Sequence, residues 1–570
     1  MFKNLTILVL FSFSTLLSCA QKDSLDYQGN WIGTLPNQHS FNFYITLEKL
    51  KSNNYHLVIA NNKTLIDNNL KSTSDDHIQI SIDSKTHINL YNTNNGTELS
   101  GFINTGRYFY HVSLQQIGSN KFEGKWNPFM LDNGLISDDI LLSVENNDDG
   151  TFGAYTYFGD QRFRGAFSSE FKKKDNTLFF KDSNTGFLYR AILLKNTIEL
   201  EIYLSDALVT KTNLTRFEAD WESKISAINQ NRNQESNTPP QLNDGWVTKN
   251  IDDFGFNETQ LLRLIDSVNS KKLVNTHCIL IAKQEKLIFE TYFDGFNANI
   301  PHDLRSASKS ISSAMIGIAI DDKIIGSVDE KLYDFIPKAY QYTKDSLKSK
   351  ITIKDLLTMN SGLDVNNIAS ENYYQNSNNW LKTTLEAPMV KEPGTYADYG
   401  SANPFLLGVY LNERLEKPLE IYMDEKFFAP LGITNYINQT DDMEIAPYFG
   451  GGMLLTPRDM LKFGQLYLNK GIWKGKQIIS EKWVKESFEK HVQLQDRNKN
   501  EYGYLWWHGT YIVDGKEITS IEARGAGGQF IFVIPELELV VVITSGNFRN
   551  RKGNQPQKIL KEYILPAILN

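Results

Sequence analysis

The chain of 570 residues is too long for one compact core, because single cores stop growing at roughly 250–300 residues. Hydrophobic residues make up 41% and charged residues 22%, which is typical of a globular protein and excludes wholesale disorder and a multi-span membrane protein. The net charge of -8 offers no basic surface, so we expect no nucleic-acid partner. With two cysteines and nine scattered histidines, the sequence predicts neither a disulfide scaffold nor a metal site.

Residues 1–20 have the features of an export signal. Lys3 supplies a positive charge, and the apolar run at 5–17 is shorter than the ~20 residues that span a bilayer. The letters LLSC at 16–19 resemble a bacterial lipobox, in which the cysteine is lipidated after cleavage. We therefore expect export to the cell envelope as an outer-membrane lipoprotein attached through a lipid on Cys19. The alternative is ordinary cleavage after Ala20, which releases a soluble protein.

Residues 25–220 are predicted to form an all-β domain, either a barrel or a sandwich. Apolar and polar side chains alternate at 41–47, 78–82 and 198–204, the period of half-buried strands. The opening Gly-Asn-Trp at 29–31 faintly resembles that of lipocalin-like barrels. We favour a spacer domain in which Trp31 fills a core, and a ligand cup or substrate-presenting module remains the alternative.

A polar stretch at 221–246 contains two adjacent prolines and is predicted to be a linker. Beyond it, residues 247–570 mix helical stretches with short strands and predict an α/β domain. Ser306 and Lys309 stand at the start of a helix whose apolar residues recur every three or four positions from Ile311 onward. Their spacing of three residues puts the two side chains on the same side of that helix.

A serine and a lysine placed in this way have a chemical use. A serine hydroxyl becomes an effective nucleophile when a neighbouring base takes its proton. Lys309 can be that base only as a neutral amine, and burial together with the positive end of the helix dipole disfavours its ammonium form. First-turn N–H groups, including that of Ser306, point to where an oxyanion would form. The alternative is a capping serine beside a surface lysine, because Ser-x-x-Lys is common by chance.

Further segments, in a fixed order along the chain, support the catalytic interpretation. They are 306–313 (SASKSISS), 356–363 (LLTMNSGL), 393–395 (PGT) leading to 399–401 (YGS), and 451–460 (GGMLLTPRDM). Together they resemble the serine β-lactamase and penicillin-binding-protein superfamily, nearest to its esterase-like and 6-aminohexanoate-dimer-hydrolase-like members. The resemblance covers residues 252–570. It implies an antiparallel sheet flanked by helices, no cofactor or metal, and a small-molecule or peptide substrate with an ester or amide bond.

The same resemblance implies roles for individual residues. Ser306 is the expected nucleophile, and Lys309 and Tyr399 are the expected proton-transfer groups. The backbone N–H groups of Ser306 and Gln529 are the expected oxyanion hole. Ser401 stands where many relatives have Asn, and we assign it to substrate binding.

The third motif departs from the family. Relatives carry Lys-Thr-Gly or His-x-Gly on a strand that lines the cleft, whereas this chain has RGAGGQFIF at 524–532, with Ala526 at the cationic position. Arg524, two residues earlier, would face the same side of the strand and is the expected substitute cation for substrate binding. Gly527 and Gly528 are expected to let a substrate backbone approach closely.

Two aromatic runs are further candidates for the cleft. Trp506, within YGYLWWH at 502–508, is assigned to the wall of a hydrophobic substrate pocket, although this run suits a core equally well. The run from Tyr373 to Trp380 is a candidate flap.

The sequence thus predicts a serine hydrolase that works through an acyl-enzyme on Ser306. One alternative is a penicillin-binding D,D-peptidase or β-lactamase, which the loss of the cation at Ala526 disfavours. The other is a non-catalytic, ligand-binding envelope protein. The set of Ser306, Lys309 and Tyr399 disfavours that alternative, because binding alone would not require all three.

Overall fold

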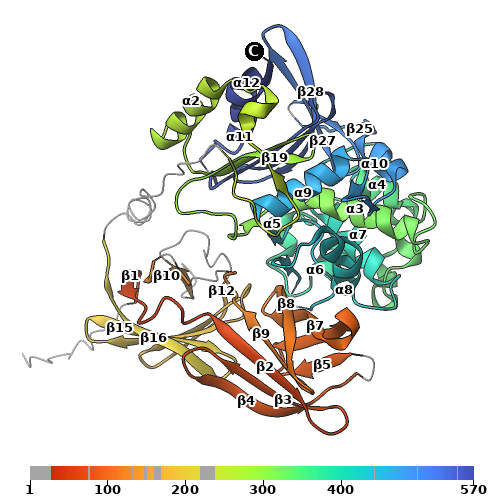
Figure 1. Ribbon diagram of the computed structural model, residues 1–570. Helices are drawn as coiled ribbons and strands as arrows, with labels where there is room; N and C mark the ends of the chain where they lie inside the picture. Colours follow the sequence, from red (N-terminus) through yellow and green to blue (C-terminus); the bar gives the residue numbers. More distant parts are fainter. Residues whose placement is uncertain are drawn as a thin grey trace, which may run out of the picture.

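The computed structural model describes residues 27–74, 77–130, 134–135, 137–146, 151–158, 168–218, 238–441, 443–496, 498–548 and 550–569. The expected signal segment, Cys19 and most of the expected linker lie outside these ranges. In the described part of the chain, no helix is both long and apolar enough to cross a membrane. Figure 1 shows an all-β part below, coloured red to yellow, and a mixed part above it, coloured green to blue.

The N-terminal domain is built from two antiparallel sheets. The first has the strand order β11-β10-β1-β16-β15-β14-β13-β12. Its strands are β1 (Gly29–Thr34), β10 (Asp139–Asn146), β11 (Phe152–Phe158), β12 (Ser168–Lys174), β13 (Thr177–Asp182), β14 (Leu188–Leu194), β15 (Thr197–Leu204) and β16 (Ala207–Arg216). The second contains β2 (Phe43–Lys49), β3 (Asn54–Ala60), β4 (Thr64–Lys71), β5 (Ile78–Ser81), β6 (His87–Thr93), β7 (Glu98–Thr105), β8 (Tyr108–Gly118) and β9 (Lys121–Trp126).

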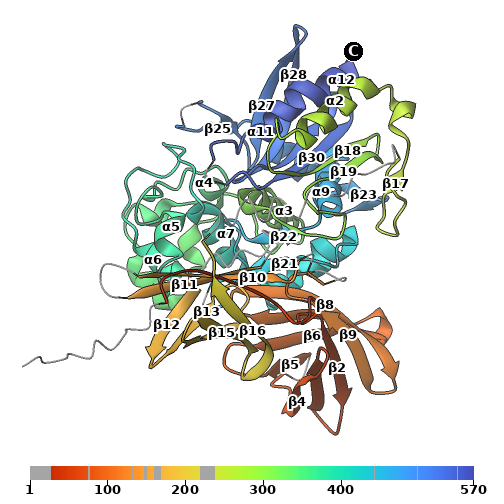
Figure 2. The same ribbon diagram turned by 90° about the vertical axis from the view of Figure 1, so that its left-hand side faces the viewer.

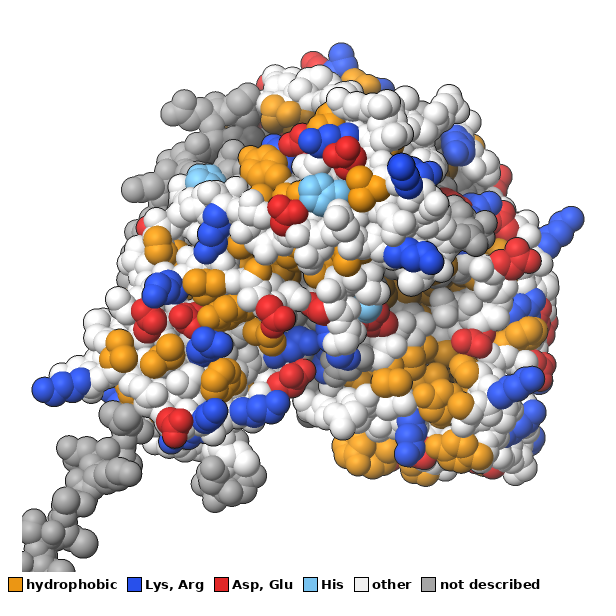
Figure 3. Space-filling model, turned by 90° about the horizontal axis from the view of Figure 1, so that it is seen from below, with side chains coloured by type: hydrophobic (Ala, Val, Ile, Leu, Met, Phe, Trp, Pro, Cys, Tyr) orange, Lys and Arg blue, Asp and Glu red, His pale blue; other side chains and the backbone are white. Residues whose placement is uncertain are grey.

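The two-residue alternation explains how these sheets pack. On β2, Phe43, Ile45 and Leu47 are buried, whereas Tyr44 between them is exposed. Buried side chains of both sheets join in one apolar core, to which Trp31 of β1 belongs. The predicted all-β domain is therefore confirmed. Seen from below, its surface carries Lys and Arg interspersed with Asp, Glu and hydrophobic side chains (Figure 3).

The second domain is organised around a nine-stranded sheet in the order β17-β19-β18-β30-β29-β28-β27-β26-β25. The short β17 runs parallel to β19, and the other pairs are antiparallel. The strands are β17 (Val247–Thr248), β18 (Thr276–Lys283), β19 (Lys286–Tyr292), β25 (Val492–Gln493), β26 (Glu501–Tyr502), β27 (Trp507–Val513), β28 (Lys516–Gly525), β29 (Gln529–Ile534) and β30 (Leu539–Ser545). A separate hairpin joins β23 (Ile472–Trp473) to β24 (Lys476–Gln477).

Helices flank this sheet on both faces, as the resemblance implies. Ile279 and Ile281 of β18 pack in one core with α2, α11 and α12, whereas Leu280 and Ala282 pack in another with α3 and α9. The helices are α2 (Glu258–Asn269), α3 (Ser308–Asp321), α4 (Ile353–Leu357), α5 (Glu371–Tyr374), α6 (Trp380–Glu386), α7 (Ala402–Asn412), α8 (Leu419–Met423), α9 (Pro457–Leu468), α10 (Glu481–Phe488), α11 (Gln555–Ile559) and α12 (Leu565–Leu569).

The two domains are joined by a continuous sheet. The second sheet of the N-terminal domain extends from β8 into β21 (Ile437–Gln439), β22 (Met453–Leu455) and β20 (His302–Asp303) of the second domain. Figure 2 shows β21 and β22 between the two parts. Because β20 ends at Asp303, this sheet leads directly to the segment that carries Ser306.

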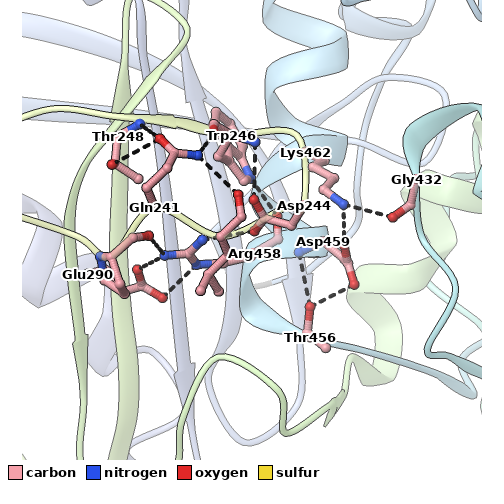
Figure 4. Close-up of polar contacts among 12 residues, drawn as sticks. Gln241, Asp244, Trp246, Thr248, Glu290, Gly432, Thr456, Arg458, Asp459 and Lys462 are labelled. Carbon is pink, nitrogen blue, oxygen red and sulfur yellow. Dashed lines mark hydrogen bonds and ion pairs between the residues drawn. The ribbon is translucent and has the colours of Figure 1, made fainter.

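A buried ion-pair cluster fixes the segment that precedes the second domain (Figure 4). Arg458 of α9 donates to Glu290 at 2.8 Å, to Asp244 at 2.9 Å and to the Pro240 carbonyl at 2.8 Å. The Trp246 indole donates to the Arg458 carbonyl at 3.2 Å. Buried charges are tolerated when they are paired in this way. The last residues of the expected linker, 238–246, therefore pack as part of the second domain.

Candidate active site

Ser306 lies in a short 3-10 turn, Arg305–Ala307, that leads into α3. Asp303 shapes this turn, because its Oδ1 accepts a hydrogen bond from the Arg305 backbone N–H at 2.9 Å. Arg305 has a φ of 49°, in the left-handed region that costs a non-glycine residue about 1–3 kcal/mol. Backbone strain of this kind clusters at functional sites. Ser306 itself is half-buried and so keeps some contact with solvent.

The side chains of Ser306 and Lys309 meet, as their helical spacing predicts. Lys309 is 1% exposed, and its Nζ donates to Ser306 Oγ at 2.8 Å, to Ser401 Oγ at 3.0 Å and to the Gly450 carbonyl. Three acceptors thus match the three N–H bonds of an ammonium group. The α3 residues from Ser308 to Ala319 are all buried, so the helix is enclosed on every side rather than along one stripe.

Tyr399 lies beside this pair. Its ring centroid is 5.3 Å from Lys309 Nζ, a cation–π distance. The rings of Trp507 and Tyr502 also pack on Tyr399, with centroids at 5.0 Å and 6.2 Å. The structure therefore brings the three expected catalytic residues together.

Ser401 connects Lys309 to a carboxylate that sequence reasoning missed. Its hydroxyl donates to Glu371 Oε2 at 3.0 Å, and the other oxygen, Oε1, accepts from the Tyr448 hydroxyl at 3.0 Å. Burial and the Glu371 carboxylate raise the pKa of Tyr448 well above its usual value, so Tyr448 stays a hydrogen-bond donor. Neither Glu371 nor Tyr448 belongs to a recognisable sequence motif. Tertiary packing brings both residues to Ser401, so the sequence alone gave no signal for them.

Of the candidate flap, Tyr374 and Trp380 lie in the interior, whereas Tyr373 is 53% exposed. Tyr374 and Trp380 are fully buried, and each packs its ring against Tyr448. The Tyr374 hydroxyl also bonds that of Tyr448 at 2.6 Å. These two aromatic side chains therefore form a core behind Glu371.

The strand of the third motif abuts the Ser306 turn. A Cβ on Gly525, at the end of β28, would lie 3.2 Å from the Ala307 backbone nitrogen and closer still to the Leu304 carbonyl oxygen. The hairpin then turns through Gly527 and Gly528, with φ of 81° and 92°, conformations suited to glycine. Gln529 begins β29, and its side chain donates to the Ser545 carbonyl at 2.5 Å. Its backbone thus lies on the strand pair that packs against the Ser306 turn.

The expectation that Arg524 is a free substitute cation is corrected. Its Nε donates to the buried Glu522 at 2.6 Å, and a second nitrogen donates to the His508 carbonyl at 3.2 Å. Its guanidinium carbon also lies 4.9 Å from the Trp507 ring centroid. Glu522 is two residues from Arg524 on the same strand and so faces the same side. The charge of Arg524 is neutralised there.

The assignment of Trp506 to a substrate pocket is also corrected. Its side chain is 0% exposed and packs among Phe463, Tyr467 and Phe488, with centroids 4.8–5.4 Å away. Such a side chain belongs to the core. Its half-buried neighbour Trp507, the first residue of β27, is the one that contacts Tyr399.

The described residues contain no group of three or more His, Cys, Asp or Glu side chains that could hold a metal ion. Burial, with smaller contributions from nearby cations, lowers the pKa of His508 to about 4. His508 is thus a neutral imidazole near neutral pH.

Comparisons with known proteins match about half of the chain or less. The chain is 23% identical over 300 residues to 6-aminohexanoate-dimer hydrolase of Paenarthrobacter ureafaciens, which covers 47% of this chain and 71% of that protein. It is 26% identical over 254 residues to β-lactamase-like protein 4 of Dictyostelium discoideum, which covers 36% of this chain and 44% of that protein. Among solved structures, simvastatin synthase (LovD) of Aspergillus terreus aligns with a TM-score of 0.44 and 16% identity, over 54% of this chain and 97% of that one.

The family model named Beta-lactamase matches residues 277–563, which is half of the chain. This range includes the Ser306 turn, Lys309, Tyr399 and the β28–β29 hairpin, and its sheet is flanked by helices. The second domain has the fold that the sequence motifs imply. This chain, in which an all-β domain precedes the matched region, therefore belongs to the β-lactamase family, within the superfamily of serine β-lactamases and penicillin-binding proteins.

Proposed function

We propose that this protein is a serine hydrolase that cleaves ester or amide bonds through an acyl-enzyme on Ser306. The observation that carries the proposal is the 2.8 Å hydrogen bond between the half-exposed Ser306 hydroxyl and the buried Lys309 amine. A base at hydrogen-bond distance is what a serine needs in order to attack a carbonyl. One relative is a 6-aminohexanoate-dimer hydrolase, and this supports the cleavage of amide bonds.

Acylation proceeds in two proton-coupled steps. Ser306 Oγ bonds to the substrate carbonyl carbon while its proton moves to the amine of Lys309. The resulting oxyanion accepts hydrogen bonds from the backbone N–H groups of Ser306 and Gln529. The bond to the leaving alcohol or amine then breaks, and that group takes up the proton through Lys309 and Tyr399. Water attacks the acyl-enzyme in the same way, releases the acid and restores the Ser306 hydroxyl.

A fluorophosphonate probe on the full chain tests this proposal. Wild type should be labelled and Ser306→Ala should not, because the probe forms its bond with an activated serine. Lys309→Met should label about 10²- to 10⁴-fold more slowly, the usual contribution of a general base. Absence of labelling in wild type, with a related hydrolase labelled in parallel, would favour the non-catalytic binding protein.

A fluorescent penicillin separates the proposed esterase or amidase from a D,D-peptidase or β-lactamase. The position expected to carry a cation is Ala526, and Glu522 neutralises Arg524. We therefore expect little or no acylation by penicillin. Stable labelling that disappears in Ser306→Ala would support the penicillin-recognising alternative.

We further propose that the protein is exported and held in the cell envelope by a lipid on Cys19. The support is the apolar run and the LLSC letters at 16–19. Metabolic labelling with a clickable fatty acid should mark wild type and not Cys19→Ala. Equal labelling of both forms would refute the lipid site, and a soluble mature form would favour cleavage after Ala20.

A further inference from the structure

The carboxylate of Glu371 is connected to Lys309 through a single hydroxyl group. Lys309 Nζ donates to Ser401 Oγ at 3.0 Å, and Ser401 donates its own proton to Glu371 Oε2 at 3.0 Å. Ser401 is therefore acceptor and donor at once, in an unbroken path from an amine to a carboxylate. Both hydrogen bonds have ordinary lengths for proton transfer between heavy atoms.

Such a path has a use whenever Lys309 carries its charge. Ser306, Ser401 and the Gly450 carbonyl together accept three hydrogen bonds from Lys309, the set that suits an ammonium group. An ammonium group has no free lone pair and cannot accept the proton of Ser306. When Lys309 is an ammonium group, one proton must therefore leave it before the serine can attack.

We propose that Glu371 stores this proton. Lys309 passes one proton to Ser401 Oγ while the Ser401 hydroxyl proton moves to Glu371 Oε2. The products are a neutral amine, an intact serine hydroxyl and a carboxylic acid, so atoms and total charge balance. No proton is exchanged with bulk solvent. Glu371 does not touch the reacting atoms and is therefore a positioning residue that acts through Ser401; its role rests on the proposed function of Ser306.

The other polar and charged groups around Glu371 are compatible with this role. Tyr448 donates to Oε1 at 3.0 Å and Gln375 at 3.3 Å, so one carboxylate oxygen is held while Oε2 faces Ser401. Burial and the Glu371 charge also raise the pKa of Tyr374, so it remains a hydroxyl like Tyr448. Arg305 is a further cation near Glu371, and Asp303, at 2.9 Å, pairs with it and raises its pKa.

The pH dependence of fluorophosphonate acylation, measured on the full chain from pH 6 to 10, tests the proposal. Wild type should label at a nearly constant rate between pH 7 and 9, because Lys309 does not need to lose its proton to solvent. Glu371→Gln keeps the size of the side chain but cannot store a proton. It should label at least tenfold more slowly at pH 7, and its rate should rise about tenfold per pH unit.

Two variants of Ser401 control for folding and geometry. Ser401→Ala breaks the path and should show the same rising profile as Glu371→Gln. Ser401→Thr keeps a hydroxyl and should restore the flat profile of wild type. A Glu371→Gln profile that runs parallel to wild type, merely lower or unchanged, would overturn the proton store and leave the serine hydrolase intact. Absence of labelling in wild type would instead overturn the proposed function, and the proton store with it.

Discussion

A methyl group at Gly525 should reduce acylation without unfolding the protein. Gly525 ends β28, and its backbone runs against the turn that carries Ser306. A Cβ there would lie within 3.0 Å of the Leu304 carbonyl oxygen, a separation that real Cβ atoms essentially never show, and 3.2 Å from Ala307 N. Both neighbours are backbone atoms, so the strand must retreat, by roughly 1 Å to reach van der Waals contact.

This retreat would separate the two expected oxyanion donors, because Gln529 is paired with Gly525 across the hairpin. A misplacement of about 1 Å costs catalysis on the order of 10²-fold, whereas overpacking costs roughly 1–3 kcal/mol of stability. We therefore expect Gly525→Ala to label with fluorophosphonate 10- to 100-fold more slowly than wild type, an estimate taken from about 1 Å of misplacement. Gly118→Ala is the matched control, since its Cβ would meet only Lys121, at 3.6 Å. A folded Gly525→Ala that labels as fast as wild type would refute the coupling between strand and turn.

Further predictions concern residues that sequence reasoning misjudged or left aside. Trp506→Ala should lower the free energy of unfolding by about 3–5 kcal/mol in urea titrations, whereas Trp507→Ala should cost less stability and slow acylation through its contact with Tyr399. Arg458→Ala leaves the Glu290 charge buried and should cost about 3–5 kcal/mol, and removing both charges in Arg458→Met/Glu290→Leu should cost less. The unfolded chain binds a proton at His508 below about pH 6.5, whereas the folded chain does so only near pH 4. Stability should therefore fall as the pH drops from about 6.5 to about 4, and His508→Asn should reduce that slope.

The local spacing of residues in the sequence was enough to predict individual strands and the contact between Ser306 and Lys309. The alternation at 41–47 became β2 with a buried and an open face, and the Ser306 and Lys309 spacing became a contact of 2.8 Å. Both patterns involve residues only a few positions apart, so the neighbouring sequence is enough to determine them.

The sequence was less informative where the site depends on which of two adjacent side chains is buried, or on contacts between residues far apart in the chain. Trp506 and Trp507 are adjacent in the sequence, yet Trp506 is fully buried in the core and Trp507, at the start of β27, contacts Tyr399. The pairing of Arg524 was readable, because Glu522 stands two residues before it on the same face. Glu371 had no such signal, since its partners Ser401 and Tyr448 lie 30 and 77 residues away along the chain.

The two domains also interlock more closely than a linker between them would predict. Phe102 and Phe109, from β7 and β8, are buried in the core of the second domain. Phe296, Ile300 and Ile437 of the second domain are buried in the N-terminal core. Removing the β domain would expose these side chains and take away β8, one of the two partner strands of β21. Activity is therefore best measured on the full chain.

The same interface reaches the proposed proton path. Arg107, on the turn before β8, places its guanidinium 5.2 Å from the Trp380 ring centroid. Trp380 packs on Tyr448 at 5.3 Å between ring centroids, and Tyr448 holds Glu371 by its hydroxyl. Trp380 and Tyr448, in an edge-to-face contact, thus connect Arg107 to Glu371 and help to fix where the carboxylate lies relative to Ser401. The β domain is therefore part of the framework of the candidate active site, because Arg107, on the turn before β8, contacts the aromatic side chains that position Glu371.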